Sequence, residues 1–175
     1  WANQIHSSVA VKVTETGLQG PADALWTTSA NIGLIVQTAD CVPIIIYAEN
    51  GVGLIHAGWR GIVNGIIQNT IQQMREECNI LKAIIAPCIS QDCYEVGEEV
   101  VSAFTASGIP RGDFCREATP RPYVDLRAAV KHILAALDVE LIYCDPRCTY
   151  SVSSLASYRR DGPLAARIIT AVALL

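Results

Sequence analysis

Three short apolar runs rich in β-branched residues follow one another between residues 32 and 56. They cover residues 32–36, 42–47 and 52–56, and a Glu-Asn-Gly turn separates the second run from the third. Runs of this length that are bounded by turn signals are typical of strands. Their nearly unbroken apolar character predicts burial on both faces. We therefore expect three strands, the last two paired as a hairpin.

The period of the apolar positions then changes. From residue 62 to residue 78 they recur at three- and four-residue steps, which predicts an amphipathic helix. Residues 81–88 and 140–144 are expected as further strands, and residues 124–138 as a helix buried through Val130, Ile133, Leu134 and Leu137. Residues 166–175 fit a strand or a helix. The longest predicted loop covers residues 107–123, which contain three prolines and two glycines.

This alternation of strands and helices predicts the fold class α/β (α+β), with a mixed β-sheet flanked by helices. The length of 175 residues suits one domain, and no linker or internal repeat divides the chain. We therefore expect a single domain over residues 1–175.

The composition limits the classes of partner and the cellular compartment that we expect for this chain. The chain is 51% hydrophobic and 17% charged, so it can bury enough apolar surface to fold. Its formal net charge is −4 without a cluster of basic residues, which argues against nucleic acid as a partner. No apolar run is long enough for a membrane span, and the N-terminus lacks a signal-peptide pattern. Seven cysteines without a regular spacing indicate reduced thiols. We expect a cytoplasmic protein with no membrane partner.

Only three histidines are present, and two of them lie where chemistry is expected. His132 is interpreted as a surface residue of the predicted helix. His56 ends an apolar strand, and Cys41 precedes the strand that pairs with it. Because the open ends of a hairpin are neighbours, Cys41 and His56 should meet at one edge of the sheet. His6 can supply a third ligand, and a His/Cys/His set leaves a fourth position for water, as in catalytic zinc sites.

The other thiols offer an alternative metal site. Cys88 and Cys93 are separated by four residues, and Cys144 and Cys148 by three, which is looser than usual in zinc-binding pairs. We favour core or loop thiols. The segment PCISQDC differs from the zinc motif of nucleobase deaminases in its spacing, and no H-x-E precedes it, so that fold is disfavoured.

Several motifs carry a resemblance to a known family. In chain order these are NQIHSSV, ADAL, TADCVPIIIY, HAGWRG, APCISQDCYEVG, YVDLRAAV and SYRRDG. Together they resemble the bacterial family labelled multicopper polyphenol oxidases or laccases, whose relatives are described as purine nucleoside phosphorylases. The resemblance implies a zinc ion bound by His6, Cys41 and His56. It also implies phosphorolysis of adenosine, inosine and methylthioadenosine, with deamination of adenosine as a further activity; copper-dependent phenol oxidation is the older assignment.

The sequence departs from the family pattern at three places. Family members usually carry an N-terminal segment before the Gln-x-His motif, so we expect this chain to lack it. APCIS stands where the family has G-P-C-I-G, and an aromatic residue that commonly precedes SYRR is absent. These changes leave the three implied ligands in place and affect the expected wall of the pocket.

The remaining candidates follow from the chemistry of a nucleoside enzyme. Three histidines cannot ligate a blue mononuclear copper and a three-copper cluster, although a single copper can replace zinc at such donors. Arg60 and either Arg159 or Arg160 are candidates for holding phosphate. Asp40 is a candidate acid/base, or a group that orients a ligand histidine. Cys88 and Tyr94 are expected to line the pocket.

Within HAGWRG, Gly58 and Gly61 are expected to allow a tight turn that Trp59 packs. The expected partners are a purine nucleoside and phosphate, and the oligomeric state stays open. An alternative function from another class is a non-catalytic module in which zinc staples the edge of the sheet.

Overall fold

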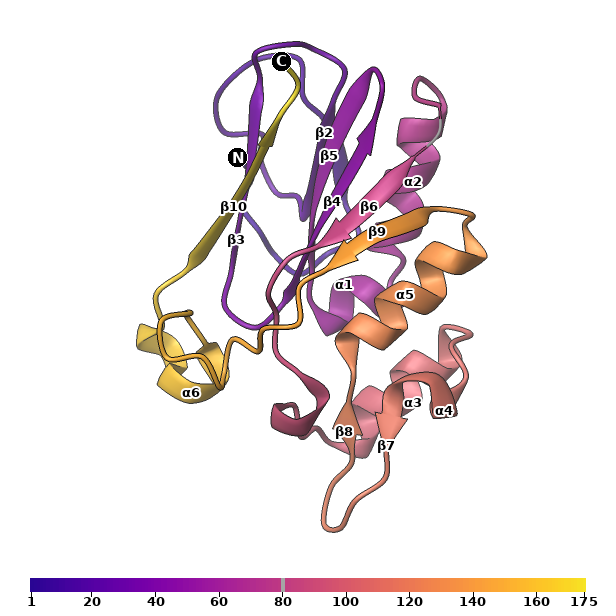
Figure 1. Ribbon diagram of the computed structural model, residues 1–175, viewed down its shortest axis with the longest axis vertical. Helices are drawn as coiled ribbons and strands as arrows, with labels where there is room; N and C mark the ends of the chain where they lie inside the picture. Colours follow the sequence, from indigo (N-terminus) through magenta and orange to yellow (C-terminus); the bar gives the residue numbers. More distant parts are fainter. Residues whose placement is uncertain (80) are drawn as a thin grey trace.

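The computed structural model describes residues 1–79 and 81–175 and arranges them in three layers. The central layer is a six-stranded mixed sheet of order β1-β2-β5-β4-β6-β9. Its strands are Ala10–Lys12 (β1), Ala24–Thr27 (β2), Val42–Ala48 (β4), Gly51–Ala57 (β5), Lys82–Ile85 (β6) and Glu140–Cys144 (β9). Figure 1 shows a second pair of strands on one face of this sheet and helices on the other. The mixed α/β architecture of one layered domain is the predicted one.

The outer pair and the helices complete the layers. Gly33–Thr38 (β3) and Ile168–Ala173 (β10) pair antiparallel, as do the two-residue strands Cys115–Arg116 (β7) and Tyr123–Val124 (β8). The helices are Trp59–Val63 (α1), Ile66–Arg75 (α2), Glu98–Ala106 (α3), Arg111–Phe114 (α4), Leu126–Ala136 (α5) and Tyr158–Asp161 (α6), with one-turn 3₁₀ helices at Gln91–Cys93 and Gly162–Leu164. No helix in the described ranges has the length and apolar character needed to cross a bilayer.

The predicted hairpin forms and occupies the centre of the sheet. β4 and β5 pair antiparallel with Val42 opposite Ala57 and Pro43 opposite His56. Every residue of β5 is buried, because α2 covers one face of this strand and the β3–β10 pair covers the other. The open end of the hairpin, where β4 begins at Val42 and β5 ends at Ala57, is therefore shielded from solvent.

Two apolar cores correspond to the two interfaces between layers. The smaller core lies between the β3–β10 pair and the central sheet, and it contains Val13, Leu25, Ile32, Leu34, Val36, Val52 and Leu54. The larger core joins the other face of the sheet to the helices and includes Ile44, Ile46, Ile55, Ile67 and Met74. Alternate residues of β5 thus belong to different cores, which explains its unbroken apolar sequence.

Three expectations about elements are corrected, whereas the C-terminal segment and the cysteines agree with what was expected. The single helix expected at 62–78 is two helices, α1 and α2, because Gly65 at the junction has a φ of +87°. β3 is buried mainly on one face, since the β3–β10 pair is an outer layer. The predicted loop at 107–123 contains α4 and β7. The C-terminal segment is a strand, β10, and the described cysteines are all free thiols.

The junction at Gly65 gives a prediction about stability. A Cβ at this position would meet only Gln68 Oε1, at 3.8 Å, so space is available and the cost of a side chain comes from the positive φ. We expect Gly65→Ala to lower the free energy of unfolding by about 1–2 kcal/mol, measured by urea denaturation. Gly112→Ala is the control, because Gly112 lies in α4 with nothing within 4 Å of a Cβ. Equal stability of the two variants would contradict the role of the turn.

Candidate metal centre

Three segments that are distant in sequence bring His6, Cys41 and His56 together. Cys41 immediately precedes β4, His56 lies near the end of β5, and His6 belongs to the N-terminal segment before β1. Their ligand atoms all lie within 4.8 Å of one another. Cys41 Sγ is 3.9 Å from His6 Nε2, and the two imidazole rings meet at 75° with their centroids 4.8 Å apart. The predicted hairpin thus brings Cys41 and His56 together, as expected from the sequence. With His6 they form a group that can hold a metal ion.

The donor set and its surroundings fit a zinc or copper ion. His56 Nδ1 donates a hydrogen bond to Asp23 Oδ1 at 2.8 Å, which leaves Nε2 with its lone pair for a cation. Two imidazoles and a thiolate are ligands that both metals accept. Among the residues that the structure describes, this is the only group of three or more such side chains. The alternative site made of four cysteines has no support there.

The electrostatics of the cluster also suit a cation. Burial raises the pKa of the Cys41 thiol, but hydrogen bonds with His56 and His6 outweigh it and lower the value to about 7. Burial lowers the pKa of His56, whereas its bonds to Asp23 and Cys41 raise it to about 9. The site therefore favours a thiolate beside a protonated imidazole. A bound cation would take the place of that proton.

The N-terminal segment is held in register by the side chain of Gln4. Gln4 Nε2 donates to the carbonyl of Gln37, and Gln4 Oε1 accepts from the Gln37 amide, both at 2.8 Å. The side-chain amide thus pairs with β3 as another strand would. Two residues later His6 adopts a φ of +58°, which turns the chain toward the metal centre. This pairing gives a physical reason for the Gln-x-His spacing.

Gly58 and Gly61 are required for space beside the ligands. Gly58 has an extended backbone, with φ −76° and ψ 163°, so the expected tight turn is wrong at this position. A Cβ on Gly58 would lie 2.9 Å from His6 Cδ2 and 3.1 Å from Cys41 Sγ. A Cβ on Gly61 would lie 3.0 Å from the Ser7 carbonyl oxygen. Both glycines let the N-terminal segment approach the start of α1.

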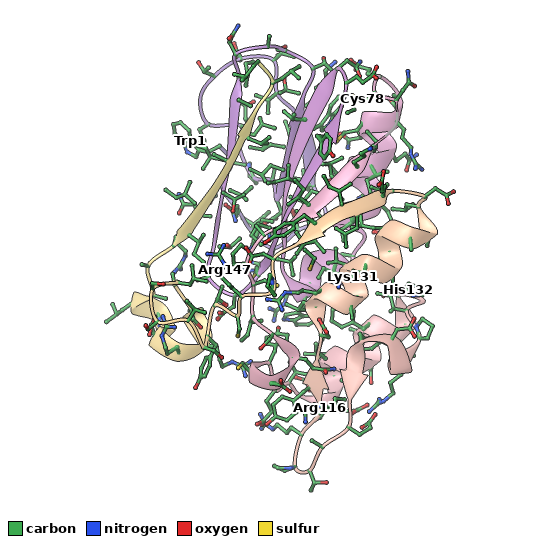
Figure 2. The ribbon with its side chains drawn as sticks, viewed as in Figure 1. Trp1, Cys78, Arg116, Lys131, His132 and Arg147 are labelled. Carbon is green, nitrogen blue, oxygen red and sulfur yellow. The ribbon has the colours of Figure 1, made fainter. Side chains whose placement is uncertain are left out.

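The metal centre lies in the wall of a cavity of about 960 Å³. This is near the upper end of the range for small-molecule sites. Of the candidates from the sequence, Asp40, Arg60, Tyr94 and Arg159 line it. Further lining residues that the sequence did not indicate include Trp1, Thr38, Tyr158 and Arg167. Figure 2 shows Trp1 beside the β3–β10 pair, whereas His132 lies on α5.

Asp40 is held by two contacts from distant parts of the chain. Its Oδ1 accepts from Thr149 Oγ1 and its Oδ2 from the Arg159 amide, both at 2.6 Å. Asp40 has a φ of +88° and is buried. The carboxylate that orients a ligand histidine is Asp23, and Asp40 instead anchors the segment that carries Arg159.

Arg160 and Cys88 lie outside the lining of this cavity, which corrects their expected role. The Arg160 guanidinium donates to the carbonyls of Thr149, Tyr150 and Leu155, and to Asp161. It therefore braces the loop before α6. Cys88 is fully buried, and burial raises the pKa of its thiol to about 12. His132 bonds to Asp113 at 2.8 Å and is partly exposed on α5, as interpreted from the sequence.

Steric contact at Gly58 gives a prediction about metal affinity. Gly58→Ala would push the His6 ring away from Cys41 Sγ while leaving an allowed backbone. We expect the zinc dissociation constant to rise by about 10-fold, measured by competition with a chromogenic chelator. Gly33→Ala is the control, because nothing lies within 4 Å of a Cβ there. Wild-type affinity in Gly58→Ala would show that the close approach has no role in metal binding.

The layered fold and the His/Cys/His cluster, which could hold a metal ion at the wall of a cavity, define the class as an α/β protein with a candidate metal centre. A family model described as multi-copper polyphenol oxidoreductase laccase matches residues 1–175, and the chain belongs to this family.

Named relatives and a solved structure agree with this placement. The chain is similar to a purine nucleoside phosphorylase of Xylella fastidiosa, with 33% identity over 175 residues, 92% of this chain and 66% of the relative. It is also similar to adenosine deaminase RL5 of an unknown prokaryotic organism, with 37% identity over 171 residues, 90% of this chain and 64% of the relative. The chain thus spans about two thirds of the length of these curated relatives. The crystal structure of Bacillus licheniformis hypothetical protein YfiH matches with a TM-score of 0.93 at 26% identity, covering 100% of this chain and 73% of that one.

Proposed function

We propose that this protein is a zinc-dependent purine nucleoside enzyme. Its main reaction is the phosphorolysis of adenosine or inosine, and of methylthioadenosine, to free base and ribose 1-phosphate; deamination of adenosine is a side activity. The observation that carries the proposal is a His/Cys/His cluster in the wall of a cavity large enough for a nucleoside and phosphate together. The names of the two relatives support the same class of substrate.

The cavity offers surfaces suited to a purine ring. Trp1, Trp59, Tyr94 and Tyr158 line it, and aromatic faces bind planar bases by stacking. Thr38 also lines it, and its buried hydroxyl has no hydrogen-bond partner among the residues described. A buried hydroxyl without a partner is costly, so a polar atom of the substrate is a fitting partner for Thr38.

The cavity also offers guanidinium groups for phosphate. Arg60 stacks on Trp59 at 4.4 Å, and its guanidinium has no hydrogen-bond partner among the residues that the structure describes. Arg159 lies over the Tyr94 ring at 5.1 Å and donates one bond to the Glu95 carbonyl, which leaves other donors for a ligand. Guanidinium groups bind phosphate through paired, charge-assisted bonds. We assign phosphate to Arg60 and Arg159.

The residues divide the work of the reaction. His6, Cys41 and His56 would hold a zinc ion, which would supply Lewis acidity next to the substrate. Arg60 and Arg159 hold phosphate against C1′ of the ribose, so that its oxygen attacks as the bond to the purine breaks. Asp40 is the candidate to hold or return a proton at its carboxylate, and it also fixes the Arg159 backbone. The free thiols suit a reducing, cytoplasmic location, which we include in the proposal.

The two alternative functions, a non-catalytic zinc staple and copper-dependent phenol oxidation, account for fewer features of the cavity. A zinc staple needs a fourth protein ligand, whereas the described residues group only three. Copper-dependent phenol oxidation is compatible with the donors, but it leaves the arginines of the cavity without a charged partner. The nucleoside enzyme uses both the metal ligands and the arginines.

Removal of the thiolate tests the proposal. Cys41→Ala is expected to lose bound zinc and the phosphate-dependent conversion of adenosine to adenine, because two imidazoles alone hold zinc weakly. Metal analysis and chromatography of the products measure the two effects. Cys115→Ala is the control, since Cys115 is half-buried in β7 and does not line the cavity. A zinc-loaded wild-type protein that leaves adenosine and inosine unchanged, with and without phosphate, would refute the proposed function.

Arg60 provides a separate test of the phosphate assignment. Arg60→Gln is expected to raise the KM for phosphate by about 10-fold or more, because it removes a charge-assisted pair of bonds. The zinc content and the KM for nucleoside should change little. Arg116→Gln is the matched control, since Arg116 also stacks on an aromatic ring, Tyr123 at 4.4 Å, but outside the cavity lining. An unchanged KM for phosphate in Arg60→Gln would remove Arg60 from the site.

A further inference from the structure

The Asp23 carboxylate, one residue before β2, receives an unusual number of hydrogen bonds. Its oxygens accept from the backbone amides of Ile5, His6 and Ser7 at 3.3, 3.0 and 2.5 Å, from Ser7 Oγ at 2.7 Å, and from His56 Nδ1 at 2.8 Å. The residue is only 1% exposed. All of these donors belong to the N-terminal segment or to a candidate metal ligand.

One oxygen atom joins two of the candidate ligands. Asp23 Oδ1 accepts from both the His6 amide and the His56 ring, so a single atom relates the backbone of one ligand to the side chain of the other. Asp23 Oδ2 holds the two residues on either side of His6. The backbone also takes part, because the Asp23 carbonyl accepts from the His56 amide at 2.7 Å. Asp23 thus fixes the backbone of His6 relative to the imidazole of His56.

The same segment forms part of the cavity. Trp1, Ala2, Asn3, Gln4 and His6 all line it. The carboxylate therefore connects two features that are otherwise separate: the ligands of a cation, and the N-terminal wall of the space beside it.

We propose that Asp23 is a positioning residue that couples cation binding to the docking of the N-terminal segment, residues 1–7. The coupling works in both directions. A cation that binds His6 and His56 holds the segment against Asp23, and the docked segment presents His6 at the distance that the cation needs. The charge of Asp23 adds to that of the Cys41 thiolate, and together they would offset the charge of a divalent cation at the wall of the cavity.

Asparagine cannot replace this carboxylate, because each oxygen accepts from a backbone amide. In an Asn side chain, an NH₂ group replaces one of the two oxygens, so it must face either the donors to Oδ1 or the donors to Oδ2. A backbone N–H among those donors cannot become an acceptor for the NH₂ group. If the NH₂ group faces His56, the imidazole has to move its proton to Nε2 to accept the bond, which removes the lone pair that would bind the cation. If it faces Ser7, the N-terminal segment loses its anchor. Both outcomes weaken the centre.

The test is Asp23→Asn in the full chain. Its zinc dissociation constant, measured by chelator competition, is expected to rise by about 10–100-fold. Amide hydrogen exchange at residues 5–7 should become faster in the zinc-loaded protein, and the ¹⁵N NMR signals of His56 should show a changed tautomer. Asp145→Asn is the matched control: Asp145 is also buried, but its carboxylate accepts from Arg147 and does not line the cavity. It should keep wild-type zinc affinity.

A second variant keeps the proposal testable if Asp23→Asn does not fold. Ser7→Ala removes one donor to Oδ2 and retains the charge, so it should weaken zinc binding only a few-fold and speed exchange at residues 5–7. Faster exchange with unchanged zinc affinity, in either variant, would overturn the coupling, as would wild-type behaviour in both measurements. These readouts do not require turnover. A chain whose zinc affinity depends on Asp23 but that does not act on nucleosides would refute the proposed function alone.

Discussion

The candidate centre depends on one buried negative charge. A carboxylate removed from water is costly unless hydrogen bonds replace its hydration, and Asp23 has donors for both of its oxygens. Most of these donors come from residues 5–7, which lie outside the strands of the sheet. These bonds change the pKa of Asp23. Burial raises this pKa, but the hydrogen bonds from His56 and Ser7 outweigh the effect of burial and hold the pKa well below its usual range. The N-terminal segment and the carboxylate therefore stabilise each other.

The layered sheet explains how the other two ligands reach the same place. β5 is covered on both faces, so His56 is buried. His56 is also the next-to-last residue of β5, and this end of the strand lies at the cavity. The antiparallel register then places the start of β4, and with it Cys41, next to the end of β5. Gly58 follows at once and leaves room for the His6 ring. The short segment from His56 to Gly61 thus combines a ligand, the space for a second ligand and the first residues of α1.

What the sequence could predict follows from the range of the interactions involved. The hairpin is local, so its register could be inferred from a turn and two apolar runs. That register also predicted that Cys41 and His56 are neighbours. Asp23 and Gln4 were missed because their partners lie 33 residues away in each case, at His56 and Gln37, and no periodicity links them. The sequence signals for Asp23 are its place in the ADAL motif and an acidic residue directly before the apolar run of β2. Arg159 and Arg160 are adjacent in sequence, and only the packing of α6 decides that one lines the cavity while the other braces a loop.

The cavity is bordered by charges of both signs, and this bears on the class of substrate. Cys41 lines the cavity, and the buried Asp23 bonds to His56 from outside the lining; these two form the negative region that suits a cation. Arg60, Arg159 and Arg167 line the cavity with positive charge. A neutral phenol would contact the first region and leave the guanidinium groups unpaired. Under the proposed function, the neutral base and sugar would lie beside the metal ligands, and the phosphate anion would pair with the guanidinium groups. The aromatic rings under Arg60 and Arg159 hold these guanidinium groups in place before the anion arrives, which reduces the side-chain entropy that binding must remove.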